Sequence, residues 1–115
     1  MFHYLRGIAL IATMIFCCGA ACAANGYSAN VIMVGCRAFV SDGQSQASLV
    51  DRGYCAGLVD GISYALGGVC TNPNVTIGQK VRVVVKYVDD RPARQDENFI
   101  LLAFEALRAA WPCKN

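Results

Sequence analysis

Apolar residues recur at helical spacing in four stretches of this chain, and each stretch is bounded by residues that begin or end helices. Ser28 is a good N-cap for the first stretch, and Gly67-Gly68 is a strong stop for the second. Pro92 is well placed to open the last stretch, and Pro112 ends it. The predicted helices cover residues 28–39, 49–66, 77–89 and 92–111, so the sequence predicts an all-α fold, a small antiparallel four-helix bundle.

Each predicted helix has an apolar face that we expect to be buried in a common core. In the first helix this face holds Val31, Val34, Cys36 and Ala38, and in the second it holds Leu58, Ile62, Ala65 and Leu66. In the last helix it holds Ile100, Ala103, Phe104, Leu107 and Ala110.

The third stretch, Ile77 to Asp89, has two interpretations. Its run of valines is rich in β-branched residues, which favour a strand. A helix would give one apolar face, made of Val81, Val84, Val85 and Val88. Gln79, Arg82 and Lys86 would lie elsewhere on the wheel. Thr76 is a plausible N-cap, so we favour the helix and keep the strand as the alternative.

Small residues recur every four positions in the second predicted helix, at Gly53, Gly57, Gly61 and Ala65. On a helix they form one row where another backbone can come close. Glycine inside a helix costs roughly 0.5–1 kcal/mol against alanine, so this row predicts tertiary packing as compensation. We expect packing against another helix of the same chain, with a homodimer face as the alternative. The charged residues of this stretch exclude a membrane-spanning helix.

The N-terminal segment has the features of a secretory signal. Arg6 provides the positive region, Ile8 to Phe16 the apolar region, and Ala21-Cys22-Ala23 the small-residue cleavage pattern. Residues 1–23 are therefore predicted to be removed, with cleavage after Ala24 as the second choice, which leaves one domain, residues 24–115. An uncleaved membrane anchor and a lipid anchor on Cys22 are the alternatives, and they are the only membrane contacts that the sequence predicts.

Charge and composition exclude two classes of function. Without the leader, nine Lys and Arg face eight Asp and Glu, and both signs are spread along the chain, so we expect no nucleic-acid partner. The only histidine, His3, leaves with the leader, so no Ser-His-Asp or Cys-His arrangement can form. Asp89 and Asp90 are adjacent in a turn, where side chains diverge, so they are not an acid/base pair. We expect no enzymatic activity and no cofactor.

Four cysteines remain after removal of the leader: Cys36, Cys55, Cys70 and Cys113. An even number in a small exported chain predicts two disulfides. Wide spacing and the missing histidine argue against a metal site. In an antiparallel bundle the first two cysteines lie at one end of a helix pair, and the end of the second helix lies beside the end of the fourth. This predicts the pairs Cys36–Cys55 and Cys70–Cys113.

The chain resembles the Tai-type family of small exported immunity proteins, which protect bacteria against peptidoglycan amidases delivered by type VI secretion. The resemblance rests on Cys55-x-Gly57-x-x-x-Gly61, on Cys70 with Val75-Thr76-x-Gly78-Gln79, and on Tyr87-Val88, Pro92, Ala106-Leu107 and Pro112-Cys113. It implies a periplasmic, helical, disulfide-bonded protein, commonly dimeric, that has no activity of its own and inserts a loop into the effector's cleft.

Two loops are available for that role. The partner-binding residues that the resemblance implies are Asn72, Pro73, Asn74 and Val75 in the first loop, and Asp89, Asp90 and Arg91 in the second. A cysteine-anchored loop that contains proline is stiff, so it loses little entropy on binding. The residues taken without the resemblance also fit a general envelope protein that binds clients or responds to stress, and this is the alternative function.

Overall fold

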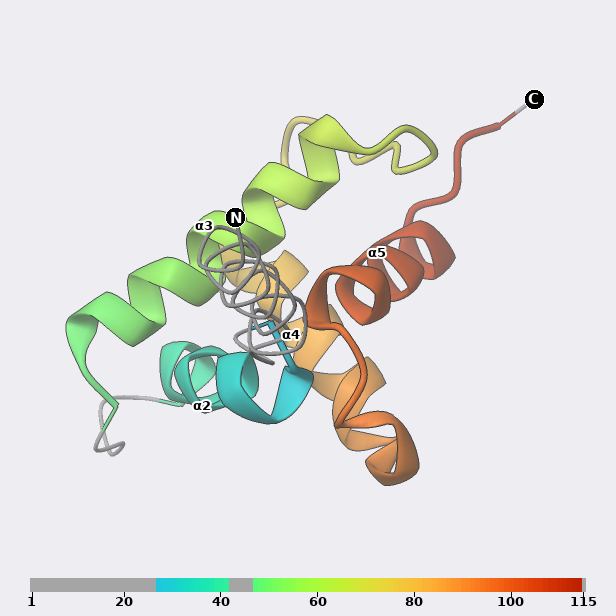
Figure 1. Cartoon of the computed structure of the whole chain (residues 1–115). Coiled ribbons are helices and arrows are strands. Elements are labelled where there is room, and N and C mark those ends of the chain that lie inside the picture. Colours follow the sequence, from blue (N-terminus) through green and yellow to red (C-terminus); the bar gives the residue numbers. More distant parts are fainter. Residues whose placement is uncertain (1–26, 42–46, 115) are drawn as a thin grey trace, which may run out of the picture.

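Four α-helices and one short 3-10 helix follow one another in the computed structural model, which describes residues 27–41 and 47–114. They are α2 (Ala29–Val40), α3 (Leu49–Ala65), α4 (Ile77–Asp89), η1 (Pro92–Arg94) and α5 (Phe99–Ala110) (Figure 1). Within this part of the chain there is no β-strand, and the predicted all-α fold is confirmed. The predicted leader and its cleavage site lie outside the described residues.

Local capping signals define the starts of α3 and α4. Each helix begins with a capping box, in which the N-cap side chain and the side chain three residues later each bind the other's backbone N–H. Ser48 and Asp51 form this box in α3, and Thr76 and Gln79 form it in α4. The ambiguous valine-rich stretch is therefore a helix, with the predicted bounds Ile77–Asp89.

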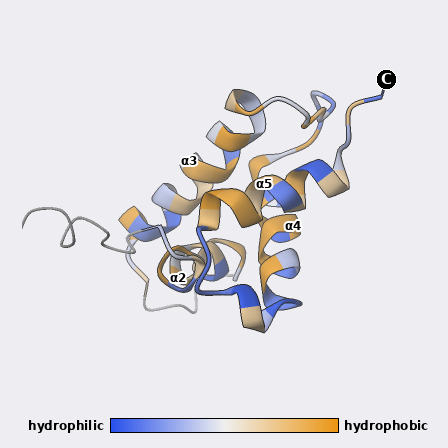
Figure 2. Ribbon diagram, turned by 45° about the vertical axis from the view of Figure 1, so that its right-hand side comes forward, coloured by the Kyte–Doolittle hydropathy of each residue, from blue (hydrophilic) through white to orange (hydrophobic). Residues whose placement is uncertain are grey.

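All four helices contribute to one hydrophobic core (Figure 2). Val81, Val84 and Val88 of α4 are fully buried, whereas Val83 and Val85 are half-buried. The largest apolar side chains around the buried valines come from α5 and α2. The fully buried members include Met33, Val59, Val81, Val84, Val88, Phe99, Leu102 and Leu107. Burial of each such side chain contributes about 1.5–3 kcal/mol relative to exposure. α4 contacts each of the other three helices, so its buried valines pack at the centre of this core.

The structure corrects the predicted faces of α2, α3 and α5. Val31 and Val34 are 57 % and 53 % exposed, whereas Cys36 and Ala38 are buried as predicted. The other buried residues of α2 are Ala29, Ile32, Met33 and Gly35. In α3, Ala65 and Leu66 are exposed and Leu58 is half-buried, whereas Cys55, Val59, Ile62 and Ser63 are buried. In α5, Ala110 is exposed and Ile100 and Phe104 are half-buried, whereas Phe99, Leu102, Ala103, Ala106 and Leu107 are buried. The predicted faces differ from the buried ones because the packing of the helices against one another decides which side of each is buried. The sequence of a single helix does not specify that packing.

The last helix begins at Phe99 and not at Pro92. Pro92 opens only the 3-10 helix η1, and Asn98 caps α5 by accepting a hydrogen bond from the Ile100 N–H at 2.9 Å. Between them, Arg94 binds the carboxylates of Glu97 and Glu105 at 2.7 and 2.8 Å. This ion cluster fixes the η1 segment against α5 and lowers the pKa of both glutamates, chiefly through their hydrogen bonds with Arg94.

α2 and α3 come into close contact at Gly35 in α2. A Cβ atom there would lie 2.6 Å from the carbonyl carbon of Asp51 in α3, and closer still to its oxygen. The neighbouring residue of α2 carries the Cys36–Cys55 disulfide, whose Cα atoms are 5.2 Å apart. Close contact between α2 and α3 therefore depends on glycine at position 35, which the sequence analysis did not single out.

Both predicted disulfides are present. Cys36–Cys55 joins α2 to α3, and Cys70–Cys113 joins the α3–α4 connection to the segment after α5. In a domain with a core of this size, two such links contribute roughly 2–4 kcal/mol each to stability.

Candidate functional site

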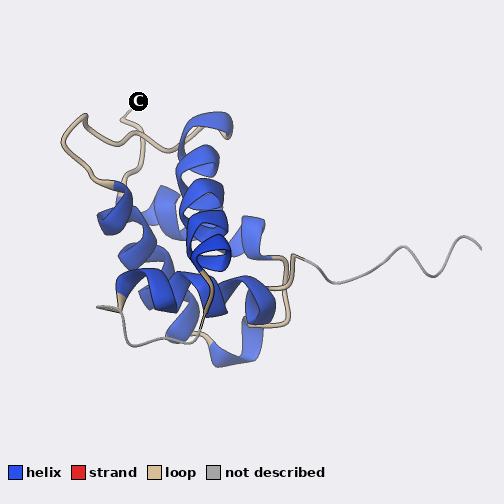
Figure 3. Cartoon of the chain, turned by 90° about the vertical axis from the view of Figure 1, so that its left-hand side faces the viewer, coloured by secondary structure: helices blue, strands red, loops and turns tan. Residues whose placement is uncertain are grey.

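The connection from α3 to α4, residues 66–76, extends beyond the helices at the end where the C-terminus lies (Figure 3). Gly68 has a φ of 98°, in the left-handed region that favours glycine, and this lets the chain turn away from α3. The Cys70–Cys113 disulfide then clamps the loop to the segment after α5. The Cys70 N–H also donates to the Trp111 carbonyl oxygen at 2.8 Å, so the base of the loop is fixed by covalent and hydrogen bonds.

The tip of this loop has its own hydrogen bonds. The Asn72 side-chain oxygen accepts from the Asn74 N–H at 2.9 Å, and the Asn72 carbonyl oxygen accepts from the Val75 N–H at 3.1 Å. Pro73 lies between them and restricts the backbone further. Asn72, Pro73 and Asn74 are exposed and Val75 is half-buried. The tip is therefore a preordered, uncharged surface available to another molecule.

The second predicted loop is engaged within the chain. Asp89 binds Arg37 at 2.7 Å, and Asp90 binds Lys86 at 2.8 Å. The Arg91 guanidinium donates to the Tyr87 carbonyl oxygen at 2.9 Å and lies over the Tyr87 ring, 3.6 Å from its centre.

The structure does not bring the two predicted loops together. One precedes the first residue of α4 and the other follows its last, and a helix of 13 residues is about 20 Å long. The seven residues predicted from the two loops therefore form two separate surfaces.

A groove of about 530 Å³ runs between α4 and α5 and was missed by the sequence analysis. Its lining residues are Arg82, Val83, Lys86, Tyr87, Asp90, Arg91, Ala106, Ala109 and Ala110. Two signals in the sequence would have pointed to it: charges spaced by four residues in α4, and small residues at three- and four-residue spacing in α5. Only the pairing of these two helices makes them one surface.

A buried ion pair lies at the base of the protruding loop. The Lys80 side chain is only 2 % exposed, and its Nζ donates to Asp60 Oδ1 at 2.8 Å and to Ser63 Oγ at 2.9 Å. The ring of Tyr64 lies 4.6 Å from the same Nζ. The sequence analysis did not predict this pair. Because Asp60 is near the end of α3 and Lys80 near the start of α4, this pair fixes the two helices that carry the loop.

The structure corrects the packing predicted for the glycine row of α3. Gly53, Gly57, Gly61 and Ala65 are all exposed, and a Cβ atom on any of the three glycines would meet no described atom within 4 Å. The row packs against no other helix in the described part of the chain, because the close approach to α2 occurs at Gly35. The alternative, a face for a second copy of the chain, stays open.

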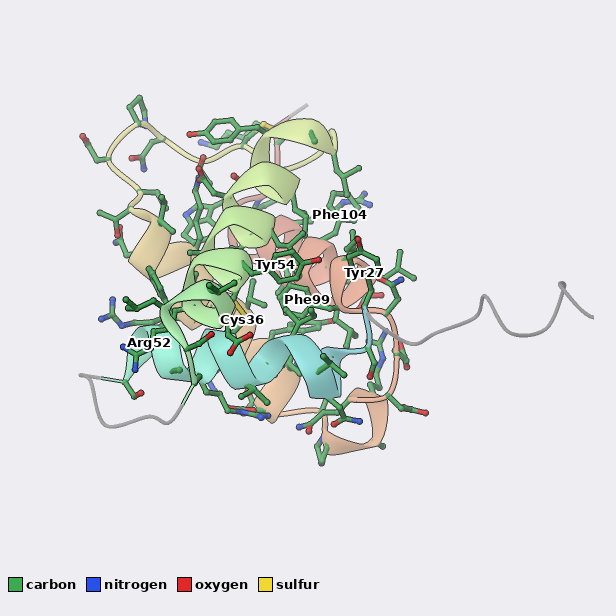
Figure 4. All side chains as sticks on the ribbon, turned by 60° about the vertical axis from the view of Figure 1, so that its left-hand side comes forward. Tyr27, Cys36, Arg52, Tyr54, Phe99 and Phe104 are labelled. Atoms are coloured by element: carbon green, nitrogen blue, oxygen red, sulfur yellow. A yellow bond between two sulfur atoms is a disulfide. The ribbon has the colours of Figure 1, made fainter. Side chains whose placement is uncertain are left out.

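A shallow apolar groove lies on this row, over Gly57, Gly61 and Ala65, and is bounded by side chains of Leu58, Ile62, Leu66 and Ile100. Near it, Tyr54 points toward Tyr27 at the start of α2 (Figure 4). Their hydrogen bond raises the pKa of the Tyr54 hydroxyl. Tyr54 and Leu66 are exposed beside this row of glycines, so the surface there is apolar.

Residues 19–113, which include the protruding loop, both grooves and all four disulfide cysteines, match the family model of the Rap1a immunity proteins. The chain belongs to the Rap1a family. This is a family of type VI secretion immunity proteins, so membership indicates a non-enzymatic inhibitor that binds a secreted effector protein. No curated protein and no solved structure matches the chain.

Two further findings concern membrane-spanning helices and metal sites in the described part of the Rap1a chain. The helices within residues 27–41 and 47–114 include none long and apolar enough to cross a membrane. The same residues contain no group of His, Cys, Asp and Glu side chains that could hold a metal ion. The surface features described above in this part of the Rap1a chain are the clamped loop, the α4/α5 groove and the apolar row on α3.

Proposed function

We propose that this Rap1a protein is exported to the periplasm, where it binds and inhibits a peptidoglycan amidase that arrives by type VI secretion. The observation that carries the proposal is the clamped loop, whose tip is exposed and ordered by the Cys70–Cys113 disulfide and the Asn72 hydrogen bonds. The resemblance of the chain to the Tai-type proteins supports an amidase as the target. The predicted leader, residues 1–23, supports export.

Rigidity is the physical reason that this loop suits an inhibitor. An enzyme cleft can be blocked by a short segment only if that segment does not lose much conformational entropy on entering it. Fixing the backbone of a free residue costs about 1–2 kcal/mol, and the disulfide, Pro73 and the Asn72 turn have already met most of that cost in the tip. The uncharged tip also carries no ion that must be desolvated in the cleft.

Replacing Asn72 to Val75 with a Gly-Ser linker of equal length should weaken inhibition of the amidase at least tenfold, about 1.4 kcal/mol of binding free energy. The linker removes the side-chain contacts and restores the entropy cost of ordering the loop. The measurement is the inhibition constant for hydrolysis of peptidoglycan peptides, with a melting curve to verify that the variant is folded.

The matched control is Asp89→Asn, which changes the other end of α4. It should inhibit like the wild type, since the Asp89 carboxylate already binds Arg37 within the chain. Equal inhibition by the linker variant and the wild type would show that the loop tip does not enter the amidase.

We also propose that two copies of the chain associate through the glycine row of α3. The row is exposed, and Cβ atoms on its glycines would meet no described atom within 4 Å. The apolar groove over Gly57 and Gly61 can receive a side chain or a second helix. The same row on a two-fold related copy would be self-complementary. A Gly57→Trp variant should therefore be monomeric by light scattering under conditions in which the wild type is dimeric, and a dimer that persists would exclude this face.

A further inference from the structure

We propose that the groove between α4 and α5 binds an acidic amphipathic helix of the effector, as a second contact separate from the clamped loop. The inference rests on the proposed function, because it takes the amidase effector as the source of that helix. Of the residues that line the groove, the resemblance implies only Asp90 and Arg91 as partner-binding residues, and nothing assigns the others to a partner.

The floor of the groove has the shape that a helix needs. Ala106, Ala109 and Ala110 form one wall at three- and four-residue spacing on α5, and their small side chains let a third helix come close. Val83 and Tyr87, four residues apart on α4, form the facing apolar surface, and both are half-buried. A helix laid between the two walls would cover apolar atoms from both.

The rim of the groove determines the charge of its occupant. Arg82 has no hydrogen-bond or ion-pair partner among the described residues, and Lys86 is 78 % exposed with Asp90 as its partner. Arg91 is held over the Tyr87 ring and uses one donor on a backbone carbonyl, which leaves other guanidinium donors free. Three cations and one carboxylate line the groove, so the complementary surface carries carboxylates.

The openness of the groove favours a protein segment over a small anion. Pockets for small ligands enclose most of the ligand, whereas the cations here lie along an exposed rim beside an apolar floor. Arg82 and Lys86 lie about 6 Å apart along α4, or just over one helical turn, and Arg91 extends the rim past the end of this helix. This spacing fits carboxylates on successive turns of a docked helix, with its apolar side on the alanines.

The test is binding of the peptidoglycan amidase that the same strain delivers by type VI secretion, measured at low and high salt. The Arg82→Glu/Lys86→Glu variant should raise the dissociation constant at least tenfold at low salt, and the salt dependence should largely disappear. Asp90→Asn should lower the dissociation constant about twofold to threefold, because it removes the one negative charge on the rim, which repels an acidic partner. Arg108→Glu, an exposed charge reversal on α5 outside the groove, is the control and should bind like the wild type.

A photo-reactive phenylalanine analogue in place of the exposed Ala109 identifies the occupant directly. Mass spectrometry of the cross-linked complex should find a helical effector segment with acidic residues on one side. Cross-linking to a basic segment, or no cross-linking in a complex that forms, would overturn the proposal.

The result for the wild type separates this inference from the proposed function. If the wild type binds the amidase and the double reversal binds equally well, the groove is excluded while inhibition through the loop stands. If the wild type does not bind the amidase at all, both proposals are wrong.

Discussion

The Asp60→Ala variant should lose about 3 kcal/mol of its free energy of unfolding. Lys80 is 2 % exposed, and Asp60 is the only carboxylate that binds its ammonium group in the described structure. Removal of Asp60 leaves a buried positive charge with the Ser63 hydroxyl and the face of Tyr64 as its contacts. The measurement is denaturant unfolding of the oxidised protein.

The matched variant is Lys80→Met, which should cost less than about 1 kcal/mol. Methionine retains most of the volume of the lysine stem and brings no charge into the core. Asp60 is 31 % exposed, so its carboxylate can be hydrated once Lys80 is gone. If Lys80→Met destabilised the chain as much as Asp60→Ala, the loss could not come from an uncompensated buried charge.

The Gly35→Ala variant should be destabilised by about 2 kcal/mol or more, because the added methyl group would collide with the backbone of α3. Backbone atoms of Asp51 cannot rotate away as a side chain could, so α2 and α3 must move apart. The adjacent Cys36–Cys55 disulfide resists that movement. Thermal and denaturant unfolding, with the disulfides intact, measure the loss.

Gly57→Ala in α3 is the control for this substitution. A Cβ atom at position 57 meets no described atom within 4 Å, so the change should stabilise the chain by roughly 0.5–1 kcal/mol through helix propensity. If Gly35→Ala left the free energy of unfolding unchanged and Gly57→Ala lowered it, the glycine row and not Gly35 would make the close helix contact.

The helices and the disulfide pairs could be predicted from the sequence because local signals specify them. The Thr76 and Gln79 capping box, the Gly67-Gly68 stop and the antiparallel order of the helices need no knowledge of distant contacts. The predicted start of the last helix was wrong because Pro92 and Asn98 both carry a start signal, and the Arg94 ion cluster fills the space between them.

The features that could not be predicted are those that depend on which helices pack against each other. Four regularly spaced small residues in α3 gave a stronger pattern than the single Gly35, yet only Gly35 meets another backbone. Lys80 was overlooked because a lysine is ordinarily exposed, and its burial requires Asp60 from another helix.

In the candidate site too, the locally specified part could be predicted and the part that depends on helix packing could not. The stiff loop Asn72 to Val75 could be predicted, because a cysteine, a proline and two asparagines in succession specify an anchored turn. The α4/α5 groove could not, because its cations and its alanines come from separate segments that only the packed core brings together. The buried Lys80–Asp60 pair then links this core to the loop by fixing the two helices that carry it.

The most direct measurement titrates the strain's type VI peptidoglycan amidase with the oxidised chain that begins at Ala24, and follows hydrolysis of peptidoglycan peptides. Inhibition that reaches completion near an equimolar ratio is the result that the account predicts. Full hydrolysis in the presence of a large excess of the chain would contradict amidase inhibition.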